Sequence, residues 1–382
     1  MRRVVGGAAL VALVHGALGA VDAQVVERLA DINPGPADSF PLLLTVVNGM
    51  LFFVADDGIH GVELWKSDGT PAGTTLVEDI FAVGSGSSDP VELTAVNGIL
   101  FFTADDGVSG RELWKSDGTA AGTTLVKDIN GVPGGSSVSG LTAVGGTLFF
   151  AADDGGTDGR ELWKSDGTST GTVLVANIDP VINADSSPEN LTAVNGTLFF
   201  TADDGLTGQE LWKSNGEPGG TTLVKDIFAL GLNSSSPSDL TAVDGTLFFT
   251  ANNGVTGREL WRSDGTGPGT VLVKDIRGGP DSSFPSSLTA VGGVLFFTAF
   301  DDVSGEELWK SDGTPGGTVL VKDIMPGDES SGVGNLTALN GLLYFTADGA
   351  AGRELWRSDG TDAGTVVVKD ISPAQATRPP MA

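Results

Sequence analysis

The sequence predicts an all-β protein, a seven-bladed β-propeller of four-stranded antiparallel blades. The first observation is that every tryptophan in the chain occupies one position of a repeat of about 49 residues. The second is that each repeat offers four short apolar runs separated by turn residues, a pattern typical of one propeller blade. A closed array of such repeats forms a single domain. The seven tryptophans are Trp65, Trp114, Trp163, Trp212, Trp261, Trp309 and Trp356.

The second repeat shows how the strands are recognised. Asn97-Gly98 is the two-residue turn that joins antiparallel strands where φ is positive. The runs on either side are rich in Phe and β-branched residues, which favour strands. No window has the apolar period of 3.6 residues that a helix needs. The expected strands are Leu93–Val96, Ile99–Ala104, Glu112–Ser116 and Thr124–Ile129, followed by a variable crossover at 130–139.

The repeated aromatic residues predict where the core lies. Because every repeat carries the same Trp and Phe positions, we expect these rings to pack between neighbouring blades. The Glu of each ELW and the basic residue after the Trp, such as Glu112 and Lys115, are expected to form ion pairs between strands.

The two ends of the chain compete for one strand position. The segment Val26 to Ile32 resembles a fourth strand that precedes the first complete repeat, whereas the last repeat ends in its own fourth strand, Val366 to Ile371. The earlier segment is therefore expected either to add a fifth strand or to displace the final one.

The first residues are typical of an export signal. Arg2 and Arg3 precede an apolar stretch, and a small-residue cleavage site follows it. We expect a signal peptide at 1–23, a single seven-repeat domain at 24–371 and a short disordered tail at 372–382. The alternative is a membrane anchor, but small residues dilute the stretch and no second apolar segment follows. Without a Cys, a lipoprotein anchor is excluded. A secreted, periplasmic or cell-surface location is expected.

Charge and cysteine content limit the possible functions. The chain has 49 acidic and 21 basic residues, a net charge of −28, and no Cys. A surface this acidic repels nucleic acid and anionic membranes, so neither is expected as a partner. The same surface attracts divalent cations. Disulfides, thiolate metal sites and a Cys nucleophile are also excluded. A monomer is expected, with an extracellular protein or carbohydrate as its partner.

The ELWKSDGT block identifies a family resemblance. The blocks resemble the bacterial ELWxxDGT repeat family, which implies an extracellular repeat protein of no established activity. The fourth copy departs from the motif and reads ELWKSNGE at Glu210 to Glu217. The strand order is also similar to kelch blades, and the Ser-Asp-Gly-Thr turn to Asp-box hairpins; both are likenesses of architecture only. The intact blocks are Glu63 to Thr70, Glu112 to Thr119, Glu161 to Thr168, Glu259 to Thr266, Glu307 to Thr314 and Glu354 to Thr361.

The sequence offers little for catalysis. Beyond the predicted signal peptide there is one histidine, His60, so a Ser-His-Asp triad would need it and a His-based zinc site is excluded. Its place in a turn favours a surface residue. Paired carboxylates for glycoside hydrolysis are disfavoured because nearly all acids belong to the repeat, whereas a catalytic acid should occur once. Acids outside the repeat, which nothing pairs, include Asp185, Glu189, Asp281, Asp328 and Glu329 in the variable crossovers.

The acidic turns are candidate calcium sites. Calcium takes six to eight oxygen ligands, which paired carboxylates with carbonyls and water can supply. The alternative is that Asp caps tight turns by accepting backbone N–H bonds, with Gly supplying the positive φ. The candidate ligands are Asp56, Asp57, Asp68, Asp105, Asp106, Asp117, Asp153, Asp154, Asp166, Asp203, Asp204, Asp264, Asp301, Asp302, Asp312 and Asp359.

These features predict a non-catalytic function. The first expectation is a secreted binding or surface-associated scaffold, with or without stabilising calcium, that presents its variable crossovers, because recognition often lies on loops over a rigid frame. The alternatives are a structural matrix component and, third, a propeller hydrolase that acts on glycans. The crossovers concerned include 81–90, 179–188 and 228–237.

Overall fold

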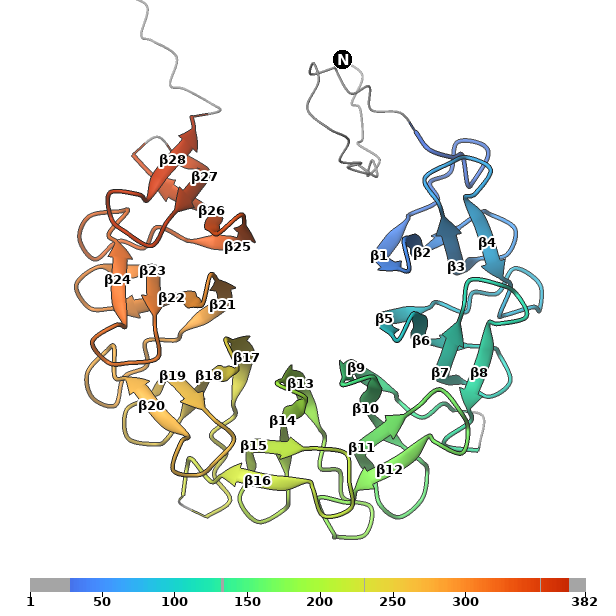
Figure 1. The fold of residues 1–382 in the computed structure, drawn as a ribbon, viewed down its shortest axis with the longest axis horizontal. Helices are drawn as coiled ribbons and strands as arrows, with labels where there is room; N and C mark the ends of the chain where they lie inside the picture. The colour runs from blue at the N-terminus through green and yellow to red at the C-terminus, as the bar shows by residue number, and fades with distance from the viewer. Residues whose placement is uncertain (1–27, 132–133, 230, 351, 371–382) are drawn as a thin grey trace, which may run out of the picture. The chain divides into compact units, whose positions relative to one another are not determined.

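The computed structural model describes residues 28–131, 134–229, 231–350 and 352–370. These residues hold 28 strands and no helix, arranged as seven four-stranded antiparallel sheets (Figure 1). The predicted all-β class, with four strands in each repeat, is confirmed. The chain falls into two compact units, residues 1–186 and 187–382, each of which is considered by itself. The expected signal peptide and the expected C-terminal tail lie outside the described residues.

Each sheet is a meander in which consecutive strands pair. The first unit holds three sheets: β1 (Leu42–Val47), β2 (Met50–Asp56), β3 (Val62–Ser67), β4 (Thr75–Glu78); β5 (Val91–Val96), β6 (Ile99–Asp105), β7 (Arg111–Ser116), β8 (Thr124–Lys127); β9 (Ser139–Val144), β10 (Thr147–Asp153), β11 (Arg160–Ser165), β12 (Val173–Ala176).

The second unit holds four sheets with the same order of strands. They are β13 (Glu189–Val194), β14 (Thr197–Asp203), β15 (Gln209–Ser214), β16 (Thr222–Lys225); β17 (Ser238–Val243), β18 (Thr246–Asn252), β19 (Arg258–Ser263), β20 (Val271–Lys274); β21 (Ser286–Val291), β22 (Val294–Asp301), β23 (Gly305–Ser311), β24 (Val319–Lys322); β25 (Gly334–Leu339), β26 (Leu342–Gly349), β27 (Gly352–Ser358), β28 (Val366–Lys369).

Local sequence explains the strand boundaries of the second repeat. Asn97 and Gly98 have φ of 49° and 80°, as the predicted two-residue turn requires. The fourth strand ends at Lys127, two residues earlier than expected. The reason is that the Ile129 amide donates to the carboxylate of Glu112, 3.1 Å away, and so leaves the ladder.

The core lies between neighbouring sheets. Successive side chains of a strand point to opposite faces, so Phe101 and Phe102 of β6 face different neighbours. Phe102 packs with Phe52 and Leu64 of the first sheet, whereas Phe101 packs with the buried Trp163 of the third. The same arrangement recurs in the second unit. The expectation that Trp and Phe form a core between blades is confirmed.

The segment that competes for a strand position does not form one in its described part. Residues 28–32 have no strand, although Ile32 packs against Phe53 and Trp65 of the first sheet. The fourth strand of the last sheet is β28, which pairs with β27. Within the described residues, neither a fifth strand nor a displaced final strand occurs.

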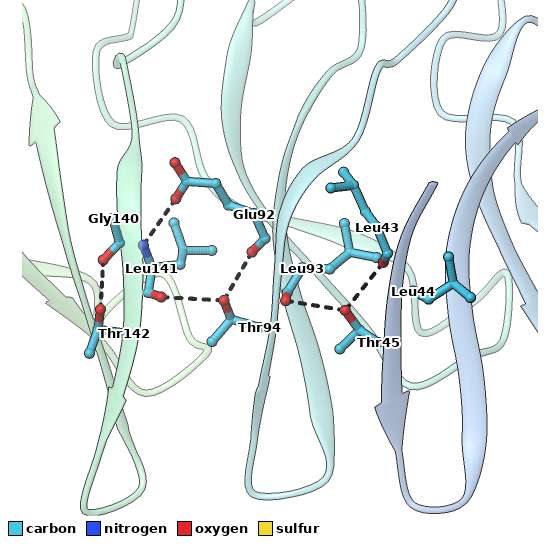
Figure 2. Close-up of a pocket in the computed structure, with 9 residues that line it drawn as sticks. All are labelled: Leu43, Leu44, Thr45, Glu92, Leu93, Thr94, Gly140, Leu141 and Thr142. Atoms are coloured by element: carbon cyan, nitrogen blue, oxygen red, sulfur yellow. Dashed lines mark hydrogen bonds between the residues drawn. The ribbon is translucent and has the colours of Figure 1, made fainter. Parts of the chain in front are cut away.

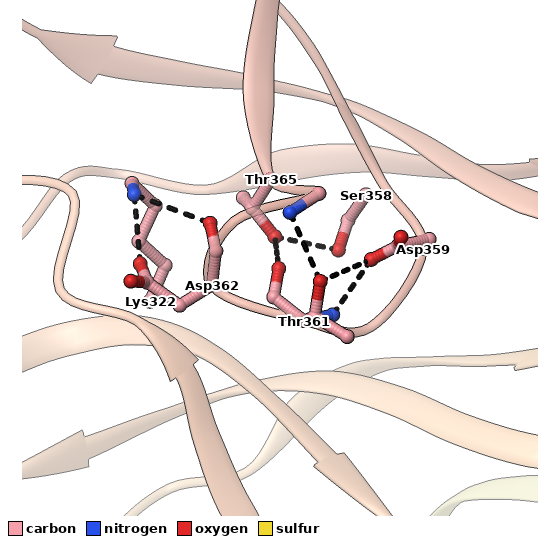
Figure 3. A network of polar contacts seen from close by, with 7 residues as sticks. Lys322, Ser358, Asp359, Thr361, Asp362 and Thr365 are labelled. Atoms are coloured by element: carbon pink, nitrogen blue, oxygen red, sulfur yellow. Dashed lines mark hydrogen bonds and ion pairs between the residues drawn. The ribbon is translucent and has the colours of Figure 1, made fainter.

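The Asp-Gly-Thr turn between the third and fourth strands is a compact hydrogen-bonded unit (Figure 3). In the last sheet Asp359 Oδ1 accepts from the Thr361 amide at 2.8 Å and from its hydroxyl at 2.7 Å. That hydroxyl accepts from the Gly364 amide, and Thr365 donates to the Thr361 carbonyl. Lys322 of the preceding sheet forms an ion pair with Asp362 at 2.7 Å. The turn is therefore fixed internally and tied to the neighbouring sheet.

The fourth repeat is expected to gain stability when its turn is restored to the common sequence. There Asn215 Oδ1 accepts from the Glu217 amide, but no threonine hydroxyl is available at that position. The double substitution Asn215→Asp and Glu217→Thr adds the two hydroxyl bonds found in the other turns, worth about 1 kcal/mol. Thermal unfolding of this variant and of Asn215→Asp alone measures the effect. An unchanged melting temperature in the double variant would contradict the role given to the threonine.

Candidate functional site

A hollow runs along the first strands of the three sheets in the first unit (Figure 2). We call it the first-strand hollow; its volume is about 490 Å³. Strands β1, β5 and β9 each supply the same three consecutive positions of the repeat to it. The lining residues are Leu43, Leu44, Thr45, Glu92, Leu93, Thr94, Gly140, Leu141 and Thr142.

Threonine hydroxyls set the spacing of the first strands. Thr45 Oγ1 lies 3.5 Å from the Leu93 carbonyl oxygen on the next strand, and Thr94 Oγ1 lies 3.3 Å from that of Leu141. Each hydroxyl also lies within hydrogen-bond distance of the carbonyl two residues earlier in its own strand. The floor of the hollow is therefore a regular ladder that ties three sheets together.

A β-bulge begins each of these strands. On β5, Val91 pairs with Thr103 and Thr94 with Phe101, so two residues, Glu92 and Leu93, stand opposite one. The bulge places Glu92 in the left-handed region, with φ of 58°. Such a conformation costs a residue other than glycine about 1 kcal/mol or more, and bulges often redirect side chains beside functional sites.

The bulge residue is the variable member of an otherwise constant strand. All seven bulge residues have φ between 55° and 71°, and six of the seven are followed by Leu-Thr-Ala. The side chain at this position therefore sets the chemistry of each first strand: it is apolar, acidic or absent in the first unit, and polar or acidic in the second. The bulge residues are Leu43, Glu92, Gly140, Asn190, Asp239, Ser287 and Asn335.

The first strands also have a free edge. In the sheet order β1, β5 and β9 stand at the end of their sheets and pair on one side only. The Leu93 and Leu141 carbonyls and the Leu141 amide bond to side chains of the neighbouring first strand, and the remaining N–H and C=O groups on that side of an edge strand are available to an added extended chain. Leu43 and Leu44 are 44% and 48% exposed beside this edge. The arrangement can hold an extended peptide and cover one of its apolar side chains.

Buried glutamates fix the crossovers between sheets. Glu161 is fully buried, and its carboxylate accepts from the Ile178 amide at 2.9 Å and from the Ser186 hydroxyl at 2.5 Å. Burial raises the pKa of the Glu161 carboxyl to about 7, although the bonds from Ser186 and Ile178 act in the opposite direction. The same burial raises the pKa of the equivalent residues Glu63, Glu112, Glu210, Glu259 and Glu307.

The predicted ion pair between Glu112 and Lys115 is wrong. The Glu112 carboxylate accepts from the Ile129 amide and the Ser136 hydroxyl instead. Lys115 donates to the Gly167 carbonyl of the next sheet at 2.8 Å. Strand alternation explains the difference, because residues three apart in a strand point to opposite faces.

The acidic turns cap themselves with backbone amides. Asp105 Oδ1 accepts from the Gly107 amide at 2.7 Å, and Asp106 Oδ1 accepts from Val108 and Ser109. The Asp117 carboxylate accepts from the Thr119 amide and from the Thr119 hydroxyl. The hydroxyl bond is the larger cause that holds the pKa of Asp117 below its usual value.

The two sets of candidate calcium ligands do not meet within a blade. The paired acids precede the third strand and the single acid follows it, so the length of a strand separates them. No group of three or more acidic or histidine ligands occurs in the ranges that the structure describes. Calcium binding stays a prediction.

His60 lies in the turn between β2 and β3. Its Nδ1 is 2.7 Å from Asp57 Oδ2, and this hydrogen bond raises the pKa of the His60 ring. Among the acids outside the repeat, Asp185 accepts from the Arg160 amide at 2.8 Å and Asp281 lies 4.0 Å from Arg277. These contacts are structural ones within turns and crossovers.

Several solved structures resemble this chain in fold. Oligopeptidase B from Leishmania major matches with a TM-score of 0.50 and 11% identity, over 87% of this chain and 49% of that one. The β-propeller domain of the Trilobed protease from Pyrococcus furiosus matches with a TM-score of 0.43 and 11% identity, over 85% and 96%. The fold is a β-propeller. A puromycin hydrolase also matches, with a TM-score of 0.43 and 14% identity, over 88% of this chain and 55% of that one.

The likeness has clear bounds. At these identities it concerns the fold, and the propeller spans about half the length of the puromycin hydrolases and prolyl endopeptidases that it matches. No protein-family model matches the chain. No curated protein matches it either.

The comparisons contradict the function expected from the sequence, a non-catalytic secreted scaffold or matrix component that binds through its crossovers. The solved structures that match the chain include prolyl endopeptidases, oligopeptidase B and the β-propeller domain of the Trilobed protease. A physical reason is that several crossovers are not free recognition loops, because each contributes a buried Ser that donates to a Glu carboxylate. In the described part of the chain, no helix has the length and apolarity to cross a membrane.

Bulge residues were missed as candidates at the level of sequence. The signal was present, since one position varies at the start of a strand that otherwise reads Leu-Thr-Ala-Val in most repeats. The positive φ that makes this position special could not be recognised, because Leu, Glu and Ser rarely adopt it.

Stability is expected to fall as pH rises from about 4.5 to 7. A carboxyl whose pKa is raised by folding binds more protons in the folded state between the two pKa values, so its contribution to the unfolding free energy is lost as pH rises through about 7. The Glu161→Gln variant, which mimics the protonated form, should show a smaller decline. Melting temperatures between pH 4.5 and 8 measure this.

Glu189→Gln is the control, because it removes the same charge from an exposed position on β13. It should keep the slope of the unaltered protein. Equal slopes in Glu161→Gln and the unaltered protein would contradict the assignment of the decline to Glu161.

Calcium binding at the acidic turns is expected to raise the melting temperature, since a ligand that binds only the folded state stabilises it. Unfolding in millimolar calcium and in chelator measures the difference. Magnesium at equal ionic strength separates binding from screening, and identical melting temperatures in all three conditions would count against a calcium site.

Proposed function

We propose that this chain is the propeller part of a peptidase, and that the first-strand hollow holds extended peptides during their processing. The observation that carries the proposal is that edge strands and exposed leucines occur together in one hollow. Its volume of about 490 Å³ is within the range of small-ligand sites.

The chemistry of the hollow suits a peptide better than a sugar or a nucleotide. An extended peptide satisfies its own N–H and C=O groups by pairing with an edge strand. Its side chains alternate, so one of them can cover Leu43 and Leu44 while its neighbours face away. Nucleotide phosphates would meet Glu92 and the strongly acidic chain.

Hydrolysis itself is assigned to a separate catalytic domain or subunit. His60 is the single histidine among the described residues, and its Nδ1 bonds to Asp57 in a turn away from the first strands. The peptidases that share the fold are about twice the length of this chain. The predicted signal peptide would place this processing outside the cytoplasm.

The proposal predicts that the protein binds an extended, alternating leucine–serine octapeptide and that Leu43→Asn weakens this binding about tenfold. Loss of one buried leucine contact removes roughly 1.5 kcal/mol. The variant should fold, because Asn190 and Asn335 occupy the same bulge position with φ of 55° and 56°. Anisotropy of a fluorescent label on the peptide's C-terminus measures the affinity.

Two controls sharpen this test. Leu339→Asn replaces a leucine of β25 that is 53% exposed and lies outside the hollow, so it should leave affinity unchanged. A glycine–serine octapeptide should bind at least tenfold more weakly than the leucine–serine one. Equal affinity for both peptides, or no effect of Leu43→Asn, would overturn the proposed function.

A further inference from the structure

A single carboxylate stands at the edge of the first-strand hollow. Glu92 is half-buried, and its Oε2 accepts from the Leu141 amide of the next sheet at 3.0 Å (Figure 2). This bond fixes the side chain across the gap between β5 and β9. The residue at the equivalent position of β9 is Gly140, which adds no side chain to the hollow. The carboxylate is thus held in place beside an open apolar surface.

Among the described residues, no ion pair neutralises Glu92. The hydrogen bond to its carboxylate from a described residue is the one at Oε2, so its Oε1 accepts none from the described part of the chain. Arg111, on the third strand of the same sheet, directs its guanidinium to the carbonyl oxygens of Asp89 and Thr103. One oxygen of Glu92 is therefore free for a ligand.

The positive φ that Glu92 shares with the other bulge residues is unusual for a glutamate. Its φ of 58° lies in a region that Gly and Asn adopt more readily than Glu. Gly140, Asn190 and Asn335 fill the same position in other repeats. A carboxylate is not needed to form this bulge, so the fold alone does not account for it.

We propose that the first-strand hollow selects peptides that carry a positively charged nitrogen beside an apolar residue, with Glu92 as the residue that pairs with the cation. This rests on the proposed function, in which the hollow holds peptides. A cation at Oε1 forms a charge-assisted hydrogen bond, which is stronger than a neutral one. The apolar residue covers Leu43 and Leu44, and the net charge of −28 draws cationic peptides toward the site.

The cation has two chemical sources, the α-ammonium of a peptide N-terminus and the side chain of Lys or Arg. Four octapeptides of the leucine–serine type, labelled at the C-terminus, separate them: free amine with one Lys, free amine without Lys, N-acetylated with one Lys, and N-acetylated without Lys. The last is the neutral reference.

The test compares the unaltered protein with Glu92→Gln and Asp239→Asn. Glutamine keeps an acceptor for the Leu141 amide but removes the charge, while Asp239→Asn removes one charge at the equivalent bulge of β17, outside the hollow. Glu92→Gln should weaken binding of at least one cationic peptide about tenfold and leave the neutral peptide within twofold. Asp239→Asn should change no affinity more than twofold, and melting temperatures check that all three proteins fold.

The outcomes separate the two proposals. Dependence on Glu92 that disappears on N-acetylation identifies the α-ammonium, and dependence that disappears without Lys identifies the side chain; both support the inference. If the neutral peptide binds as tightly as the cationic ones, or Glu92→Gln affects all four equally, the inference is wrong while the proposed function stands. If no peptide binds, both fail.

Discussion

The architecture depends on the second strand of each sheet being buried on both faces. Phe101 and Phe102 are neighbours in sequence, but one packs on the third sheet and the other on the first. A sheet of four short strands cannot hide both faces alone, so each repeat is stable only beside another. Because the chain has no Cys, no disulfide relieves this dependence. The packing between sheets is the constraint to which the turns, crossovers and first strands conform.

The crossovers meet that constraint through a buried carboxylate. A crossover that passes over a packed core leaves backbone amides away from water, and these need acceptors. Glu161 supplies two oxygens to the amides and hydroxyl of its crossover. The burial that makes these bonds effective also disfavours the charged form. Glu161 is therefore both a structural contact of its crossover and one of the buried glutamates through which pH affects the stability of the fold.

Most of the fold could be predicted from the sequence because its signals are local. Asn97-Gly98 and the alternating apolar runs determine turns and strands without reference to distant residues. The partner of Glu112 could not be predicted, since Ser136 lies 24 residues away in a crossover of variable sequence. The candidate site was also missed, because a bulge depends on register between two strands. Nothing in the sequence marks Glu92 as a bulge residue; only the register between β5 and β6 does.

The β-bulge affects how the binding surface of the protein can change in evolution. The hydroxyl ladder and the packed faces belong to constant positions, while the bulge residue differs from Leu43 to Glu92 to Gly140. The positions that form the packed frame and the position that lines the first strand are thus different residues within each unit of about 49 residues. Exchange of one unit for another by recombination would rewrite the lining and leave the packing untouched, so new binding preferences can arise without a new fold.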